Sequence, residues 1–152
     1  MNIIFLDIDG VLNSQNKLIE IYNITGKPHS SIYFPFDEKC LENLKNLVEE
    51  TNSKIVITST WRKYEEKMNV LINKFKEYNL DKSIIGYTPV LNIQRQYEII
   101  EYLMSLDTNV NYVIIDDITD MGELNNKLIV TNYKTGLTKE NVNSAIKILK
   151  KG

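Results

Sequence analysis

Short apolar runs that end in polar residues recur along the chain, and they predict β-strands. The clearest are residues 3–6 (Ile-Ile-Phe-Leu), 54–57 (Lys-Ile-Val-Ile) and 112–115 (Tyr-Val-Ile-Ile). Runs this short, with apolar residues at consecutive positions, are typical of strands that are buried on both faces of a parallel sheet. Two further strands are predicted at residues 83–86 and 127–130.

Between these strands, apolar residues recur at intervals of three and four positions, which predicts amphipathic helices. Four helices are expected, starting near Asp37 and after Trp61, Asn92 and Thr138. Strands that alternate with helices predict an α/β fold of three layers, in which a Rossmann-like parallel sheet carries helices on both faces. Residues 13–36 show no clean periodicity and contain Gly and Pro, so we expect a long loop insertion there, placed over the site.

Composition narrows the class of protein. The length of 152 residues suits a single domain over residues 1–152. One cysteine, Cys40, excludes an internal disulfide framework, and with one histidine it excludes a cysteine-rich zinc site, so a cytoplasmic location is expected. No apolar run approaches the ~18 residues of a spanning helix, and no membrane partner is expected. The net charge of -2 gives no general attraction to nucleic acid.

Polar residues that can carry chemistry follow the three clearest strands. They are Asp7, Asp9 and Gly10 after the first, Thr58 and Ser59 after the second, and Asp116 and Asp117 after the third. The carboxyl ends of parallel strands share one edge of a sheet, where ligands bind, so these groups should converge. Gathered carboxylates repel one another unless a cation or protons intervene, and hard oxygen ligands suit Mg²⁺. The alternative is that each Asp only caps a turn or helix.

Four segments resemble the motifs of the haloacid dehalogenase-like (HAD) superfamily of phosphatases. Residues 5–13 (Phe-Leu-Asp-Ile-Asp-Gly-Val-Leu-Asn) resemble the first motif, 55–58 the second and 114–117 the fourth, and Arg95 is the best match for the third. The run Thr-Ser-Thr-Trp-Arg at 58–62 and the late Thr-Gly-Leu-Thr resemble, more narrowly, the HAD domains of Swiss Army Knife RNA-repair proteins.

This resemblance implies a phosphatase that works through an aspartyl-phosphate intermediate. Asp7 is expected to be the nucleophile, and Asp9 the general acid that protonates the leaving oxygen and then the base that activates water. Mg²⁺ is expected to bind Asp7, the backbone carbonyl of Asp9 and a carboxylate of the fourth motif. Asp117 is the first choice for that carboxylate, while Asp116 either holds a ligand water or binds directly.

The same resemblance implies a set of phosphate-binding residues. Thr58 is expected to hold a phosphoryl oxygen, with Ser59 as the competing choice, and Arg95 to offset the phosphate charge. Gly10 is grouped with them because a turn beneath the metal site needs a close backbone approach that a side chain would obstruct. Two neighbouring residues each have two possible roles. Trp61 either packs within the protein or stacks on a base, and Arg62 either binds a second phosphate or pairs with Glu65 or Glu66.

No substantial cap domain is expected, because residues 13–36 form only a loop-sized insertion. An open site suits a macromolecular phosphate, and the resemblance favours a nucleic-acid end such as a 3′-phosphate. The alternatives are a small-molecule phosphatase that acts on a nucleotide or a sugar phosphate, and a non-catalytic phosphate-binding or interaction module with the same fold. A phospho-receiver domain is disfavoured, because it would place an adjacent acidic pair after its first strand.

Overall fold

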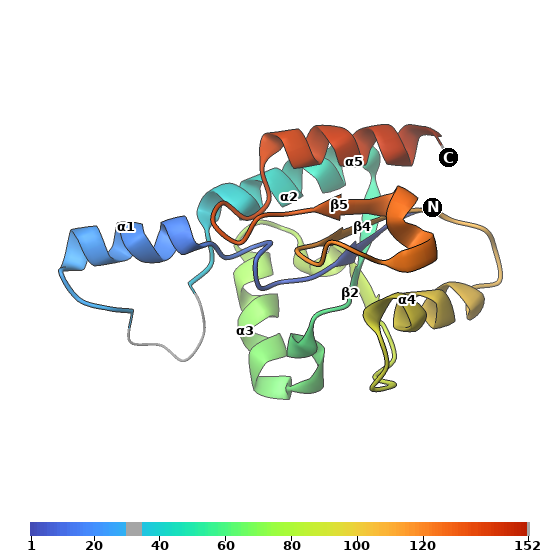
Figure 1. Cartoon of the computed structure of the whole chain (residues 1–152), viewed down its shortest axis with the longest axis horizontal. Helices are drawn as coiled ribbons and strands as arrows, with labels where there is room; N and C mark the ends of the chain where they lie inside the picture. The colour runs from blue at the N-terminus through green and yellow to red at the C-terminus, as the bar shows by residue number, and fades with distance from the viewer. Residues whose placement is uncertain (30–34, 152) are drawn as a thin grey trace.

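The computed structural model describes residues 1–29 and 35–151 of the chain. Within these residues, five strands form one sheet in which every pairing is parallel, in the order β3-β2-β1-β4-β5. The strands are β1 (Asn2–Leu6), β2 (Ser53–Ile57), β3 (Ile84–Tyr87), β4 (Asn111–Asp116) and β5 (Leu128–Val130). All five lie where apolar runs predict them, and β1 occupies the centre of the sheet (Figure 1).

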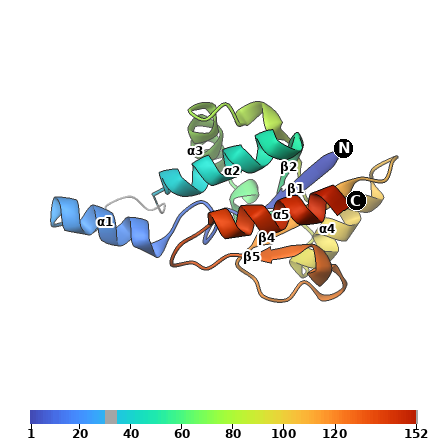
Figure 2. The same cartoon turned by 90° about the horizontal axis from the view of Figure 1, so that it is seen from above.

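Helices cover both faces of the sheet, which confirms the three-layer α/β fold. On one face lie α2 (Glu38–Thr51), α3 (Glu65–Lys76) and α5 (Lys139–Lys151), and on the other α4 (Arg95–Met104) and the short 3₁₀ helix η3 (Gly122–Lys127). Figure 2 shows α2 and α5 side by side over the sheet. No helix in the described part of the chain is long and apolar enough to cross a membrane.

The alternation of side chains along β1 explains why two layers of helices are needed. Ile4 and Leu6 belong to the core beneath α2, α3 and α5, whereas Ile3 and Phe5 belong to the core beneath α4 and η3. Successive side chains of a strand point to opposite faces of the sheet. A strand that is apolar at every position must therefore be covered on both sides.

The helices begin where the sequence predicts them in the cases where a side chain caps the first turn. Asp37 accepts a hydrogen bond from the backbone N–H of Lys39 at 3.0 Å and is the N-cap of α2, as predicted. Thr138 precedes α5 directly. The helix expected after Asn92 starts slightly later, at Arg95, because its N-cap residue Gln94 has an extended ψ of 143°.

The expected loop at residues 13–36 is wrong in part, because α1 (Gln15–Thr25) lies within it. Ser14 caps this helix through a 3.0 Å hydrogen bond from the N–H of Lys17, and Gly26 ends it in the left-handed conformation. None of its residues is buried, so no apolar stripe marks it in the sequence.

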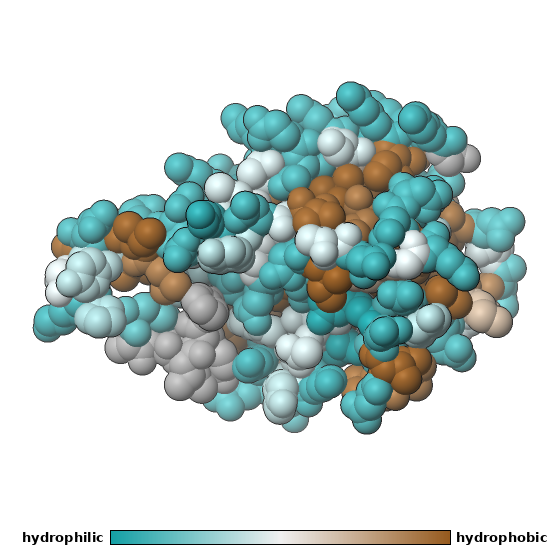
Figure 3. Space-filling model, viewed as in Figure 1, coloured by the Kyte–Doolittle hydropathy of each residue, from teal (hydrophilic) through white to brown (hydrophobic). Residues whose placement is uncertain are grey.

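In Figures 1 and 2, α1 points away from the sheet, and Figure 3 shows apolar side chains on its surface. The start of α1 lines a cavity at the strand ends, whereas the rest of α1 points away from them. Residues 30–34, within the same insertion, lie outside the described residues.

Candidate active site

The site residues are positioned by hydrogen bonds that continue the parallel sheet one residue past its strands. The N–H of Asp7 donates to the carbonyl of Ile115 at 3.0 Å, and the N–H of Thr58 donates to the carbonyl of Leu6 at 2.9 Å. The first residue after β1 is therefore locked against β4, and the first residue after β2 against β1. Parallel pairing alone brings these chemical groups together, as the sequence predicts.

Three carboxylates meet at this edge of the sheet. Asp7, Asp116 and Asp117 each place one oxygen within 4.8 Å of the oxygens of the other two. Asp7 is 5% exposed and Asp116 is fully buried, while Asp117 lies at the surface. The expected convergence of the acidic ends of β1 and β4 is confirmed. Asp116 also caps a turn by accepting the N–H of Ile118, but the three carboxylates are not separate capping residues.

Arg95, the first residue of α4, lies between two of these carboxylates. Its Nη1 is 2.7 Å from Oδ2 of Asp116 and 3.3 Å from Oδ2 of Asp7. Burial lowers the pKa of Arg95, but the charges of Asp7 and Asp116 outweigh that effect and raise it above its ordinary value. The guanidinium is thus held in its charged form at the sheet edge, where the third-motif cation is expected.

One arginine does not neutralise the cluster. Burial, and after it the charge of Asp116, raises the pKa of Asp7 from 3.8 to about 7, even though Arg95 acts in the opposite direction. Burial and then Asp116 also raise the pKa of Asp117. Carboxylates this close favour protonation or a further cation. A set of hard oxygen donors fits Mg²⁺, so the residues present suit the metal that the sequence resemblance implies.

A hydroxyl without a partner lies beside this cluster. Thr58 is fully buried, and its Oγ1 has no hydrogen-bond partner among the described residues. Ser59 is almost as buried, but its Oγ accepts a hydrogen bond from the N–H of Trp61 at 3.2 Å and so caps the 3₁₀ helix η1 (Thr60–Lys63). Because buried hydroxyls normally have partners, a ligand that bonded the Thr58 hydroxyl would complete its hydrogen bonding.

Asp9 is held by two hydrogen-bond donors whose role the sequence does not predict. Nε1 of Trp61 donates to Oδ2 of Asp9 at 3.2 Å, and Nδ2 of Asn13 donates to Oδ1 at 2.7 Å. Trp61 is 1% exposed and packs against Phe36, so it packs in the core and does not present its face to a base. Asn13 and Trp61 both lie in segments that resemble the family motifs, and this was the only feature of the sequence that pointed to them.

Gly10 allows the chain to pass close to the acidic cluster. It has a φ of +80°, and a Cβ built on it would lie 2.5 Å from Oδ2 of Asp117. Its N–H donates to Oδ1 of Asn13, and its carbonyl accepts a 2.8 Å hydrogen bond from Thr131. Both backbone groups therefore already have partners within the protein, and glycine is required for space and conformation.

Neither expected role of Arg62 agrees with the structure. The guanidinium forms a buried ion pair with Glu98 at 2.9 Å rather than with Glu65 or Glu66. Its Nη1 also donates to the backbone carbonyls of Thr58 and Ser59 at 2.8 and 2.9 Å. The side chain is 3% exposed. Arg62 therefore supports the backbone of the Thr58 turn from within the protein and has no position for a second phosphate.

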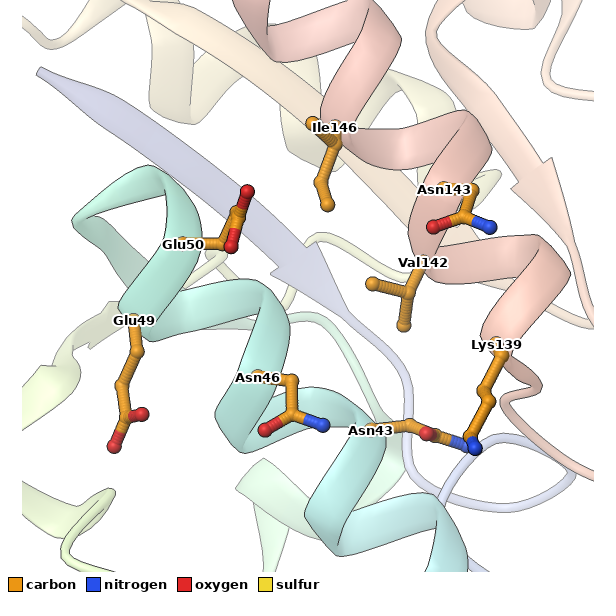
Figure 4. Close-up of a pocket in the computed structure, with 8 residues that line it drawn as sticks. All are labelled: Asn43, Asn46, Glu49, Glu50, Lys139, Val142, Asn143 and Ile146. Carbon is orange, nitrogen blue, oxygen red and sulfur yellow. The ribbon is translucent and has the colours of Figure 1, made fainter.

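Cavities flank the strand edge. One of about 380 Å³ is lined by Asp9, Gly10 and Asp117 and by the start of α1. A second, of about 340 Å³, includes Arg95. A further cavity of about 560 Å³ lies between α2 and α5 (Figure 4), and its lining of helix-surface amides, carboxylates and aliphatic side chains contains none of the strand-end residues. The chemistry therefore belongs to the strand edge.

Comparison with known proteins agrees with this geometry. Residues 3–142 match the family model described as "HAD domain in Swiss Army Knife RNA repair proteins". The matched range contains all five strands except Asn2, the first residue of β1, and every strand-end residue described above. No curated protein and no solved structure matches the chain.

Proposed function

Because the chain belongs to the family of HAD domains found in Swiss Army Knife RNA repair proteins, we propose that it is a Mg²⁺-dependent phosphomonoester hydrolase. The family supports a HAD-type, phosphatase-like function in general terms. The observation that carries the finer proposal is the cluster of Asp7, Asp116 and Asp117, with the unpartnered hydroxyl of Thr58 on the neighbouring strand end.

Asp7 is the nucleophile in this proposal. Its carboxylate attacks phosphorus in line, the new O–P bond forms as the bond to the leaving oxygen breaks, and an aspartyl-phosphate results. Asp9 donates a proton to the leaving oxygen, and the same group then takes a proton from the water that cleaves the acyl phosphate. The hydrogen bonds from Trp61 and Asn13 support this role, because they hold the Asp9 carboxyl in one orientation.

Mg²⁺ would be held by the Asp7 carboxylate, the backbone carbonyl of Asp9 and the carboxylate of Asp117. When bound, it supplies positive charge that offsets the carboxylates and the phosphate oxygens. Asp116 is less available as a direct ligand, because Oδ2 is bound by Arg95 at 2.7 Å and Oδ1 accepts the N–H of Ile118 at 3.0 Å. We therefore assign Asp116 to holding Arg95 and a ligand water.

The phosphoryl group is bound by Thr58 and Arg95. The Thr58 hydroxyl donates a hydrogen bond to a phosphoryl oxygen, and Arg95 offsets the charge that spreads over the equatorial oxygens in the transition state. Ser59 keeps its capping hydrogen bond. Gly10, whose N–H and carbonyl both have partners, contributes the close approach to Asp117 and makes no direct phosphate contact in this proposal.

For the substrate, we propose a phosphorylated nucleic-acid end, with a 3′-phosphate as the preferred case, in the cytoplasm. The family's description supports this class, because it names RNA repair. The described residues between β3 and α4 form a short connection rather than a cap domain, which suits a large substrate. A small-molecule nucleotide or sugar phosphate is the second candidate, supported by the cavities beside Asp9 and Arg95.

A turnover panel tests the proposal. It compares a 3′-phosphorylated oligonucleotide, a 5′-phosphorylated one, a nucleotide, a sugar phosphate and a phosphopeptide, each with Mg²⁺ and with EDTA. We expect Mg²⁺-dependent release of phosphate, lost in Asp7→Asn and retained in the matched surface variant Asp107→Asn. Release that persists in Asp7→Asn would refute the mechanism. No release from any substrate by the folded wild type would favour the non-catalytic module.

A further inference from the structure

The cavity beside Asp9 has a wall that is unlike the acidic edge it adjoins. It has a volume of about 380 Å³, within the ~300–1,000 Å³ range of small-molecule sites. Asp9, Gly10 and Asp117 of the strand edge line it, together with Leu18 of α1 and Tyr133 of the loop after β5. A group that leaves from a phosphate bound at the sheet edge, on the side of the general acid, would enter this space.

Two tertiary hydrogen bonds form the cavity by joining α1 to the loop after β5. The N–H of Gln15 donates to the carbonyl of Tyr133 at 2.9 Å, and the N–H of Asn16 donates to the carbonyl of Lys134 at 3.0 Å. These are N–H groups of the first turn of α1, which has no helical partners for them. The start of α1 and the backbone of Tyr133 are thereby held against each other, and both line the cavity.

The polar atoms of the cavity wall are largely used within the protein. Asn13 bonds Asp9 and the N–H of Gly10, and the Ser14 hydroxyl donates to Asp37 at 2.7 Å while it caps α1. The remaining surface is mainly apolar and includes the half-exposed ring of Tyr133, which is 56% accessible. Such a surface suits a ligand whose ring can stack on it better than a ligand that needs many hydrogen bonds.

The charges of the lining exclude another phosphate from the cavity. Its charged members are Asp9 and Asp117, both acidic, and its lining contains neither Lys nor Arg. A polyphosphate or phosphodiester placed there would be repelled and would have no cation to bind. The leaving group that fits is therefore uncharged, flat and of the size of a nucleobase with its sugar.

We propose that this cavity is the leaving-group subsite of the enzyme and that it selects an uncharged nucleoside, whose base stacks on Tyr133 against Leu18. This inference rests on the proposed phosphatase function, since it names what departs from phosphorus. The rest of a nucleic-acid strand would extend away from the cavity through its open side. Tyr133 and Leu18 are then specificity-determining residues and take no part in the chemical step.

Two substrates with the same leaving chemistry test the subsite. Adenosine 3′-monophosphate and glycerol 2-phosphate both release a secondary alcohol, and they differ in the presence of the nucleoside ring. We expect wild type to have the higher kcat/KM for the nucleotide, mainly through KM. Tyr133→Ala should lower the ratio of the two kcat/KM values about tenfold, which is the effect expected for the loss of one base stacked on an aromatic ring. Tyr133→Phe should retain the preference, and Tyr133→Ala should lower the kcat/KM for glycerol 2-phosphate much less than that for the nucleotide.

Tyr22→Ala is the matched control, because Tyr22 is 54% exposed on α1 but does not line the cavity. Adenosine alone, titrated into the ¹⁵N-labelled protein, supplies a readout that needs no turnover. We expect shifts at the amides of Gly10, Gln15 and Tyr133, and loss of those shifts in Tyr133→Ala.

The outcomes separate this inference from the proposed function. If glycerol 2-phosphate is hydrolysed but the nucleotide has no advantage, or if Tyr133→Ala leaves the advantage unchanged, the subsite is refuted while the phosphatase stands. If no substrate is hydrolysed but adenosine shifts the cavity amides, the site binds nucleosides and the phosphatase assignment fails. Adenosine shifts that occur only at other amides would also overturn the subsite.

Discussion

Replacing the nucleophile should stabilise the metal-free protein, in a way that depends on pH. Asp7 is buried beside Asp116, and its pKa is raised from 3.8 to about 7. Below pH 3.8 the carboxyl is neutral in both the folded and the unfolded chain, so this group costs the fold no stability. As the pH rises from 3.8 to about 7, the unfolded chain ionises the carboxyl while the folded protein resists its ionisation, and stability is lost over that range.

The magnitude of the loss follows from the two pKa values. A difference between 3.8 and about 7 corresponds to at most about 4 kcal/mol, since each tenfold change in proton affinity is worth about 1.4 kcal/mol. The attraction of Arg95 is already contained in the pKa of about 7. Asp7→Asn keeps the size of the side chain and cannot ionise. It should therefore be more stable than wild type by up to about 4 kcal/mol at pH 8, and by almost nothing near pH 4.

Urea unfolding in EDTA, at several values between pH 4 and pH 8, measures this difference directly. Asp107→Asn, at an exposed site, should show no such trend. Excess Mg²⁺ at pH 8 should narrow the gap, because a bound cation stabilises the ionised wild type. The reasoning is refuted if Asp7→Asn is less stable than wild type at pH 8, or if the difference between them is the same at both ends of the range.

Three further substitutions test the surroundings of the site. Trp61→Phe keeps the packing but removes the N–H that bonds Asp9, so kcat should fall about tenfold with KM unchanged, and an unaltered kcat would show that this hydrogen bond does not position the acid. Arg62→Leu leaves the buried Glu98 without its cation, which should lower the free energy of unfolding in urea by about 3–5 kcal/mol. The double variant with Glu98→Leu should recover part of that loss. Gly10→Ala adds a Cβ where 2.5 Å separates it from a carboxylate oxygen, at a φ of +80°. We expect weaker Mg²⁺ binding by calorimetry and a loss of about 1–3 kcal/mol in stability, and wild-type affinity would contradict the need for glycine.

Much of the site follows from local sequence patterns. Apolar runs of strand length identify β1, β2 and β4, and parallel pairing then places whatever follows each strand at one edge. The meeting of Asp7 with Asp116 and Asp117 is therefore implied before any coordinates are known. The capping role of Asp37 is equally local, because it depends on the next few residues alone.

Other features depend on contacts between distant segments, and local patterns do not contain them. The helix α1 has no buried face, so its existence depends on its caps, on the 2.8 Å ion pair of Lys17 with Glu38 and on its bonds to the loop after β5. Arg62 has acidic neighbours along the chain but pairs with Glu98, because the fold buries these two side chains together.

The sequence by itself determined the layers of the fold and the acidic edge, because side-chain periodicity and strand direction are properties of a continuous segment. Only the tertiary structure decided which hydroxyl is unpartnered, which donors hold Asp9, and that a mainly apolar cavity adjoins the acidic edge. Hydrogen-bond partners and cavity walls come from residues far apart in the chain, and their geometry exists only once those segments have packed.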